Sequence, residues 1–311
     1  MHQDPQYIDI RDLFRLIWMG KYVIIVVFSL AVVVALVLAV SLPNKYKSET
    51  KVRSAEASEK SGPLALEQLS ALGGLAGFNM SQQGSSVDLA IAVLQSREFL
   101  VTYAREKEIV ADLLAVKSWD SISGKILYDR ELYDPENALW VREVSAPLKV
   151  NPGDAEIYEK LKEILSVEHD PETGFVEVSI THLSPQLAYD WTRSLIERLN
   201  EEMRKKAVTQ LDRSISYLTE QMEKTQIASL GETFRQILQT QIRDRMLADA
   251  RPEYALETID PPFVPQFKSG PNRALIVIVG GIIGGILGVL LVFLIYAVKP
   301  DCLRRLNFGK M

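Results

Sequence analysis

Two long apolar runs near the ends of the chain constrain its fold more than any other feature. Residues 22–42 contain no charged side chain, and residues 274–298 form a second, slightly longer run of the same kind. A helix rises about 1.5 Å per residue, so either run is long enough to cross a hydrocarbon layer about 30 Å thick. We therefore expect transmembrane helices at 22–42 and 274–298, with a large polar domain between them.

Basic residues next to the two runs indicate how the chain is oriented. Two crossings place both tails, residues 1–21 and 299–311, on the same side of the membrane. Lysine and arginine in short segments beside a span favour the cytoplasmic side, whereas long domains translocate largely regardless of charge. We expect cytoplasmic tails and a large domain at 43–273 on the opposite side of the membrane. The tails carry Arg11, Arg15, Lys21, Lys299, Arg304, Arg305 and Lys310.

Composition and motifs give no sign of catalysis. The only cysteine is Cys302, so the large domain has no disulfide, and a net charge of −5 gives no sign of nucleic-acid binding. The chain lacks the phosphate-binding, zinc-protease, redox and hydrolase patterns GxxxxGK[ST], HExxH, CxxC and GxSxG. We predict no catalytic residue, cofactor or metal site, and structural or surface roles for His169 and His182.

Mixed local patterns predict an α/β (α+β) fold for the polar domain. Alternating side chains at 46–52, at 165–180 around a central turn, and at 253–259 are typical of strands. Ser85 is placed to cap a helix reaching about residue 108, and Asp154 is placed to cap a shorter helix.

A long helix, at about 184–228, is the dominant element predicted for this domain. Ser184 can cap it with Pro185 in the first turn, and no Gly or Pro follows until Gly231. Roughly 45 helical residues would extend almost 70 Å, too far for one small domain to cover. Apolar residues form a stripe along this helix. We expect the start of the stripe to contact its own domain and its later part to contact other helices or subunits. An intramolecular helical hairpin is the alternative. The candidate contact residues are Leu199, Met203, Leu211, Ile215 and Leu218.

The segment leading into the second apolar run combines two unusual compositions. Four prolines predict a stiff, extended strut, because proline fixes φ and removes a donor. They are Pro261, Pro262, Pro265 and Pro271. Glycines repeating every four residues in the run itself predict a helix–helix packing face in lipid. They form a ladder of Gly280, Gly284 and Gly288 and a parallel pair, Gly281 and Gly285.

Four segments carry a resemblance to a known family. They are Leu-Gln-Ser-Arg-Glu-Phe at 94–99, the hairpin 174–183 running into Ser-Pro, Thr-Ile-Asp-Pro-Pro-Phe-Val-Pro at 258–265, and 268–276 with the glycine-rich run. With this architecture, the chain resembles the Wzz-type chain-length determinants of bacterial O-antigen synthesis, the short class of polysaccharide co-polymerases. The likeness extends over almost the whole chain, and the proline segment joined to the glycine-rich run is its most specific part.

The resemblance implies an α/β base domain close to the inner membrane, a long helix reaching into the periplasm, and ring-like homo-oligomers. It also implies non-enzymatic control of how many sugar repeats a Wzy-type polymerase adds to a lipid-linked chain. The implied partners are further copies of the chain, that polymerase, the nascent polysaccharide or lipid-linked glycan, and membrane lipid. The alternatives are a capsule or exopolysaccharide adaptor working with a separate tyrosine kinase, a two-span sensor, and a membrane-anchored glycan enzyme.

Overall fold

The computed structural model describes residues 17–55, 86–224 and 228–298, so most of the N-terminal tail and all of the C-terminal tail lie outside it. The chain divides into two compact units. One contains Met1–Asn44 with Ser269–Met311, and the other is Lys45–Lys268.

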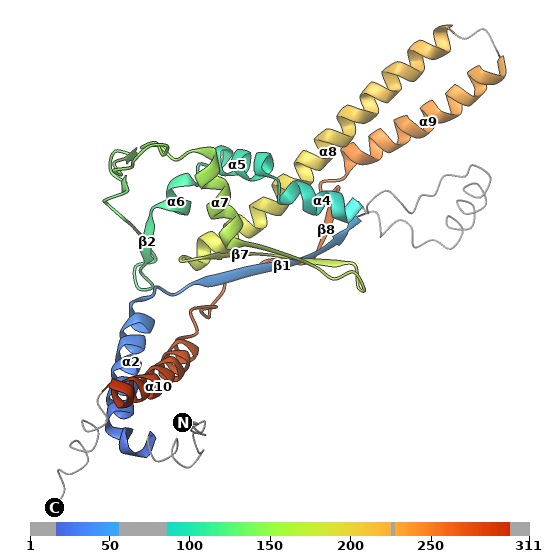
Figure 1. Ribbon diagram of the computed structural model, residues 1–311. Coiled ribbons are helices and arrows are strands. Elements are labelled where there is room, and N and C mark those ends of the chain that lie inside the picture. The colour runs from blue at the N-terminus through green and yellow to red at the C-terminus, as the bar shows by residue number, and fades with distance from the viewer. Residues whose placement is uncertain (1–16, 56–85, 225–227, 299–311) are drawn as a thin grey trace, which may run out of the picture. The chain divides into compact units, whose positions relative to one another are not determined.

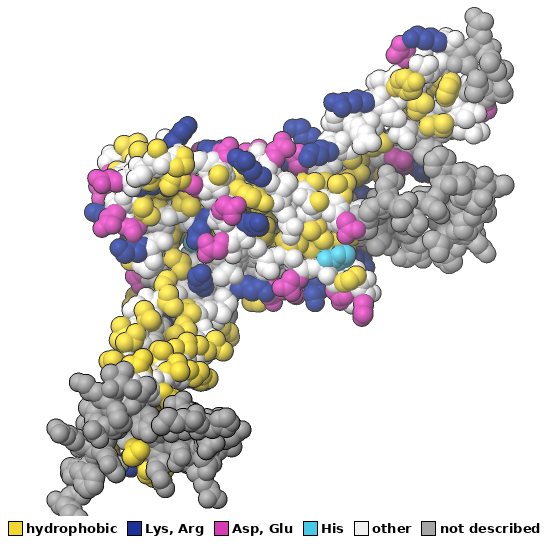
Figure 2. Space-filling view, viewed as in Figure 1, with side chains coloured by type: hydrophobic (Ala, Val, Ile, Leu, Met, Phe, Trp, Pro, Cys, Tyr) yellow, Lys and Arg dark blue, Asp and Glu magenta, His cyan; other side chains and the backbone are white. Residues whose placement is uncertain are grey.

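The first unit is a pair of apolar helices, α2 (Lys21–Ser41) and α10 (Arg273–Val298). Their mean hydropathies are 3.4 for Lys21–Ser41 and 2.9 for Arg273–Ile295. Both helices are long and apolar enough to cross a membrane. Hydrophobic side chains cover the visible face of this pair, whereas charges of both signs are spread over the visible face of the other unit (Figure 2). This contrast agrees with the predicted division into apolar helices and a polar domain.

The second unit is built on an antiparallel sheet in the order β6-β7-β1-β8 (Figure 1). The predicted hairpin and first strand are confirmed, and Ser48, Thr50 and Val52 of β1 point to the buried face as expected. The final strand begins at Leu256, three residues later than the pattern suggested. The strands are β1 (Tyr46–Ser54), β6 (Leu165–His169), β7 (Phe175–His182) and β8 (Leu256–Asp260).

Short helices precede and follow a segment of small hairpins. The single helix predicted to reach residue 108 is wrong: it breaks at Ser96, whose hydroxyl accepts a hydrogen bond from Phe99 N at 3.3 Å and so caps a second helix. Asp154 is not a cap either, because Gly153 holds that position. The helices are α4 (Ser86–Leu94), α5 (Arg97–Glu106), α6 (Val110–Leu114) and α7 (Asp154–Ile164), and the small strands are β2 (Val116–Trp119), β3 (Ile126–Tyr128), β4 (Tyr133–Asp134) and β5 (Leu139–Trp140).

The long helix α8 (Pro185–Lys224) packs along α9 (Ala228–Ala250) as a helical hairpin (Figure 1). Ser184 caps α8 as predicted, accepting a hydrogen bond from Leu187 N at 3.4 Å. The 40 residues of α8 span about 60 Å. The intramolecular hairpin, one of the two arrangements left open by the sequence, is therefore present.

A single hydrophobic core joins the sheet to the helices above it. The first third of α8 contributes Trp191, Leu195 and Leu199 to this core, against Val176, Val178 and Ile180 of β7. The outer part of α8 extends beyond the core and pairs with α9 instead. One helix thus belongs both to the compact body of the domain and to the projecting hairpin.

Candidate functional site

The glycine ladder of α10 lies against α2. A Cβ atom added at Gly280 would be 2.4 Å from Cβ of Ala35, and one added at Gly284 would be 2.4 Å from Cβ of Ala31. At Gly288 the nearest atom would be Cα of Ile24, at 3.1 Å. Real Cβ atoms do not come closer than about 3.0 Å to other carbons, because carbon atoms pack best at about 3.5–4.0 Å. The two helices therefore approach closely only because these positions lack side chains.

Small residues of α2 complete this face, and the sequence analysis missed them. Ala35 and Ala39 are buried, and together with Ala31 they repeat every four residues along α2. Gly20, just before α2, packs on Val292, since its added Cβ would lie 2.5 Å from both γ-methyl groups. Residue numbers fall along α2 as they rise along α10, so the helices are antiparallel. The signal was present as a small-xxx-small repeat in the first apolar run.

Gly281 and Gly285 lie on a neighbouring stripe with more room. Their added Cβ atoms would meet the ring of Phe28 at 3.3 Å and 3.9 Å, respectively. The ring can shift slightly at the first position, and the second contact is an ordinary van der Waals distance. The two glycine sets of α10 therefore differ in how strictly they require a missing side chain.

The proline segment continues β8 and is held against β1. Buried Thr50 donates its hydroxyl hydrogen to Asp260 O at 2.8 Å, and buried Ser48 donates to Phe263 O at 2.9 Å. Pro265 is buried, whereas Pro261 is exposed and Pro262 is half-buried. Prolines are tolerated here because β1 side chains, rather than backbone amides of the segment, supply the hydrogen bonds. Pro271 lies in the other unit, two residues before α10.

The five predicted contact residues of α8 fall into two groups. Leu199 is fully buried, and Met203 packs against the same core, so both contact their own domain. Leu211 and Ile215 are half-buried and Leu218 is 9% exposed, in the part of α8 that pairs with α9. Other apolar residues of the hairpin are exposed: Tyr217, Ile237, Ile242, Met246 and Leu247.

Ion pairs fix α8 at two points along its length. Arg245 of α9 donates to Asp212 of α8 at 2.8 Å and crosslinks the hairpin. Nearer the core, Arg198 Nε donates to Glu106 of α5 at 2.8 Å, and this hydrogen bond lowers the pKa of the Glu106 carboxyl group. Arg198 also pairs with Glu202 one turn along α8. The Arg198 guanidinium group is largely covered, so it connects the helix to the body of the domain.

His182 has the structural role expected for it. Its Nδ1 accepts a hydrogen bond from Ser184 N at 3.1 Å, so the neutral ring carries its hydrogen on Nε2, which donates to Asp112 O at 3.1 Å. Burial lowers the pKa of His182 below its usual value. His169 lies 3.9 Å from Asp88, near the surface. Within the described residues, no group of three or more His, Cys, Asp or Glu side chains could hold a metal ion.

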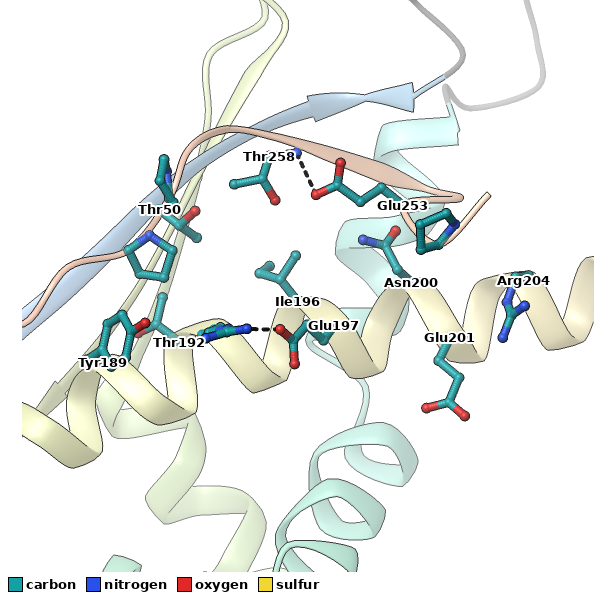
Figure 3. A pocket seen from close by; sticks show the side chains of 14 residues that line it. Thr50, Tyr189, Thr192, Ile196, Glu197, Asn200, Glu201, Arg204, Glu253 and Thr258 are labelled. Carbon is teal, nitrogen blue, oxygen red and sulfur yellow. Dashed lines mark hydrogen bonds and ion pairs between the residues drawn. The ribbon is translucent and has the colours of Figure 1, made fainter. Parts of the chain in front are cut away.

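A groove runs between α8 and the β8 edge of the sheet (Figure 3). Its cavity volume is about 660 Å³. One wall is a stripe of α8 from Tyr189 to Arg204, and the other is formed by Glu253, Thr258 and Pro262 with neighbouring residues. Asn200 stands between the walls, and its side chain is fully engaged with β8: Nδ2 donates to Leu256 O at 2.8 Å, and Oδ1 accepts from two backbone amides at 2.9 Å.

Comparison with known proteins gives one family match. Residues 6–107 match the model of the Wzz family, described as chain length determinant protein. The search of curated proteins found no match. Among solved structures, the chain is similar to a full-length bacterial polysaccharide co-polymerase, with 14% identity, a TM-score of 0.39, and coverage of 97% of this chain and 100% of that one.

A second similar structure is a fragment of WzzB, the polysaccharide co-polymerase from Salmonella Typhimurium. The identity is 14%, the TM-score is 0.31, and coverage is 73% of this chain and 100% of that one. The matched segment 6–107 contains α2, β1, α4 and α5, and with them the Leu-Gln-Ser-Arg-Glu-Phe motif at 94–99. The match confirms, over residues 6–107, the resemblance of this chain to the Wzz chain length determinants.

Proposed function

We propose that this chain is a non-enzymatic inner-membrane regulator that sets the modal chain length of lipopolysaccharide O-antigen by modulating a Wzy-type polymerase. The observation that carries the proposal is the match of residues 6–107 to the chain length determinant family. The arrangement of the chain supports it, because two apolar helices bound a mixed domain and pack antiparallel on each other. In this proposal both tails are cytoplasmic and residues 43–273 are periplasmic.

The proposed active form is a ring of identical subunits. The α8–α9 hairpin supports this assembly, because it exposes apolar side chains that its own partner helix does not cover. Tyr217 is 62% exposed and Met246 is 64% exposed, although both belong to long helices in a charged, solvated domain. Apolar residues gathered on one projecting element favour contact with another protein surface. A hairpin of a neighbouring subunit would present the same residues.

The test is a deletion of the gene in its own organism, followed by complementation. The lipopolysaccharide ladder on a gel should lose its preferred length band in the deletion strain and regain it when the chain is supplied. A blot of the membrane fraction controls for expression. An unchanged ladder would contradict the proposal. Loss of capsule or exopolysaccharide with an intact ladder would instead favour the adaptor function.

A further inference from the structure

The groove beside α8 is long enough for an extended ligand. The residues of α8 that line it recur every three or four positions from Tyr189 to Arg204, so they form one continuous stripe. Fifteen residues of helical rise correspond to about 22 Å. Pro252, Pro261 and Pro262 border the opposite side, where the chain enters and leaves β8. The shape is therefore a trough along the helix.

The lining of the groove is amphipathic and nearly balanced in charge. Tyr189, Ile196 and the three prolines supply apolar surface, and Glu197, Glu201 and Arg204 of α8 supply charge (Figure 3). The lining contains two arginines and three glutamates, and of these only Glu253 lies outside α8. This balance is unsuited to a polyanion, and the many polar groups are unsuited to a lipid tail. A neutral ligand with many hydroxyl groups fits both features.

Some of the polar side chains of the groove are available and others are not. Arg193 is paired with Glu197 at 2.9 Å. Glu201 and Arg204 make no hydrogen bond or ion pair with any residue in the described part of the chain. Charged donors and acceptors form the stronger hydrogen bonds, and a hydroxyl group can both donate to Glu201 and accept from Arg204. The end of the groove near these residues therefore has unused capacity for a polar ligand.

A peptide strand is a poorer candidate for this groove. Strand addition needs free backbone groups on the sheet edge. On this edge Asn200 already occupies the backbone of Leu256, and Glu253 Oε1 accepts a hydrogen bond from Thr258 N at 3.3 Å. The chain's own side chains thus occupy both backbone groups of Leu256 and the amide of Thr258, which leaves little of this edge for a peptide strand.

We propose that the groove between α8 and β8 binds a segment of a neutral oligosaccharide. Tyr189 and the prolines pack against the C–H faces of the sugar rings, and Glu201 and Arg204 bond to hydroxyl groups. The inference rests on the proposed function, in which a growing polysaccharide is present near the domain. It adds to that function a defined site on the chain.

The experiment uses the full chain in nanodiscs. The probe is a lipid-free O-polysaccharide fragment of a few repeats, released by mild acid from the lipopolysaccharide of the organism that encodes the chain. Binding is measured by saturation-transfer NMR and titration calorimetry, with dextran oligomers as an unrelated glycan. Tyr189→Ala and Arg204→Ala should each weaken binding by about tenfold, the effect of losing one good contact. Lys205→Ala is the matched control, because it removes an exposed charge next to Arg204 on the same helix but outside the groove.

Two further measurements keep the result decisive. Tyr189→Phe retains the ring and should bind within about threefold of the unaltered chain, whereas Tyr189→Ala should not. Hydroxyl-radical footprinting of the unaltered chain should show Tyr189 and Pro262 protected by the fragment, which needs no variant. Absence of saturable binding, or equal binding by Arg204→Ala and Lys205→Ala, would overturn the inference. The ladder of the deletion strain tests the proposed function separately, because it does not depend on this groove.

Discussion

Replacing Gly284 with alanine is the sharpest test of the contact between α2 and α10. The new Cβ would lie 2.4 Å from Cβ of Ala31, and neither atom belongs to a flexible side chain. Carbon atoms pack at about 3.5–4.0 Å, so the helices must separate locally by about 1.1–1.6 Å. A gap of about 0.5–1 Å already forfeits a quarter to a half of a dispersion contact. Overpacking of this kind typically costs about 1–3 kcal/mol.

Gly285→Ala is the matched control on the same helix. Its Cβ would lie 3.9 Å from Cδ2 of Phe28, an ordinary contact, so the expected cost is below about 0.5 kcal/mol. Both variants should insert normally, because alanine and glycine are both common in membrane helices. Gly284→Leu should destabilise the pair further, although leucine is favourable for insertion.

The stability of the helix pair can be followed by SDS titration of the purified chain in detergent. Fluorescent labels just after α2 and just before α10 lie at the same end of the antiparallel pair, so energy transfer reports separation. Cys302→Ser removes the native thiol first. In cells, Gly284→Ala should shift the modal length of the lipopolysaccharide ladder at normal membrane level. If Gly284→Ala and Gly285→Ala separate at the same SDS concentration, close packing at the ladder is refuted.

Three further changes test the domain. Burial lowers the pKa of His182, so on acidification the unfolded chain binds a proton at a higher pH than the folded chain does. Thermal stability should therefore be constant above about pH 6.5 and fall below it. His182→Gln should reduce this pH dependence. Asn200→Ala leaves buried backbone groups of β8 unsatisfied and should cost about 2–4 kcal/mol in chemical unfolding. Leu218→Ala should cost about 1–3 kcal/mol and speed hydrogen exchange in α9, whereas Tyr217→Ala should change little.

Local chemistry explains which elements could be predicted from the sequence. The hairpin was predictable because Asp170 accepts hydrogen bonds from Glu172 N and Thr173 N, and Gly174 adopts a φ of +72° that suits glycine. The start of α8 was predictable from Ser184 and Pro185 for the same local reason. Both signals lie within a few residues of the structure that they determine.

Long-range contacts explain what the sequence concealed. Alanines in an apolar run resemble ordinary filler, and only the register with α10 shows that Ala31 and Ala35 face glycines. In the sequence, Asn200 is one of many polar residues of a predicted helix. In the structure its side chain is hydrogen-bonded to β8, more than fifty residues away. The groove is likewise formed by two distant segments, so no local pattern in α8 marked it.

The sheet order places the two strands that connect to the apolar helices side by side. β1 follows α2 after four residues, and the proline segment leads from β8 to α10, while β1 and β8 are neighbours in the sheet. Within the polar domain, Ser48 and Thr50 of β1 donate hydrogen bonds to Phe263 O and Asp260 O, so side chains of β1 hold the end of β8 and the start of the proline segment. Proline fixes φ in the longer connection, and few residues form the shorter one. The two strands that lead toward the apolar helices are therefore held together within the polar domain itself, by side chains of β1 on the backbone that follows β8.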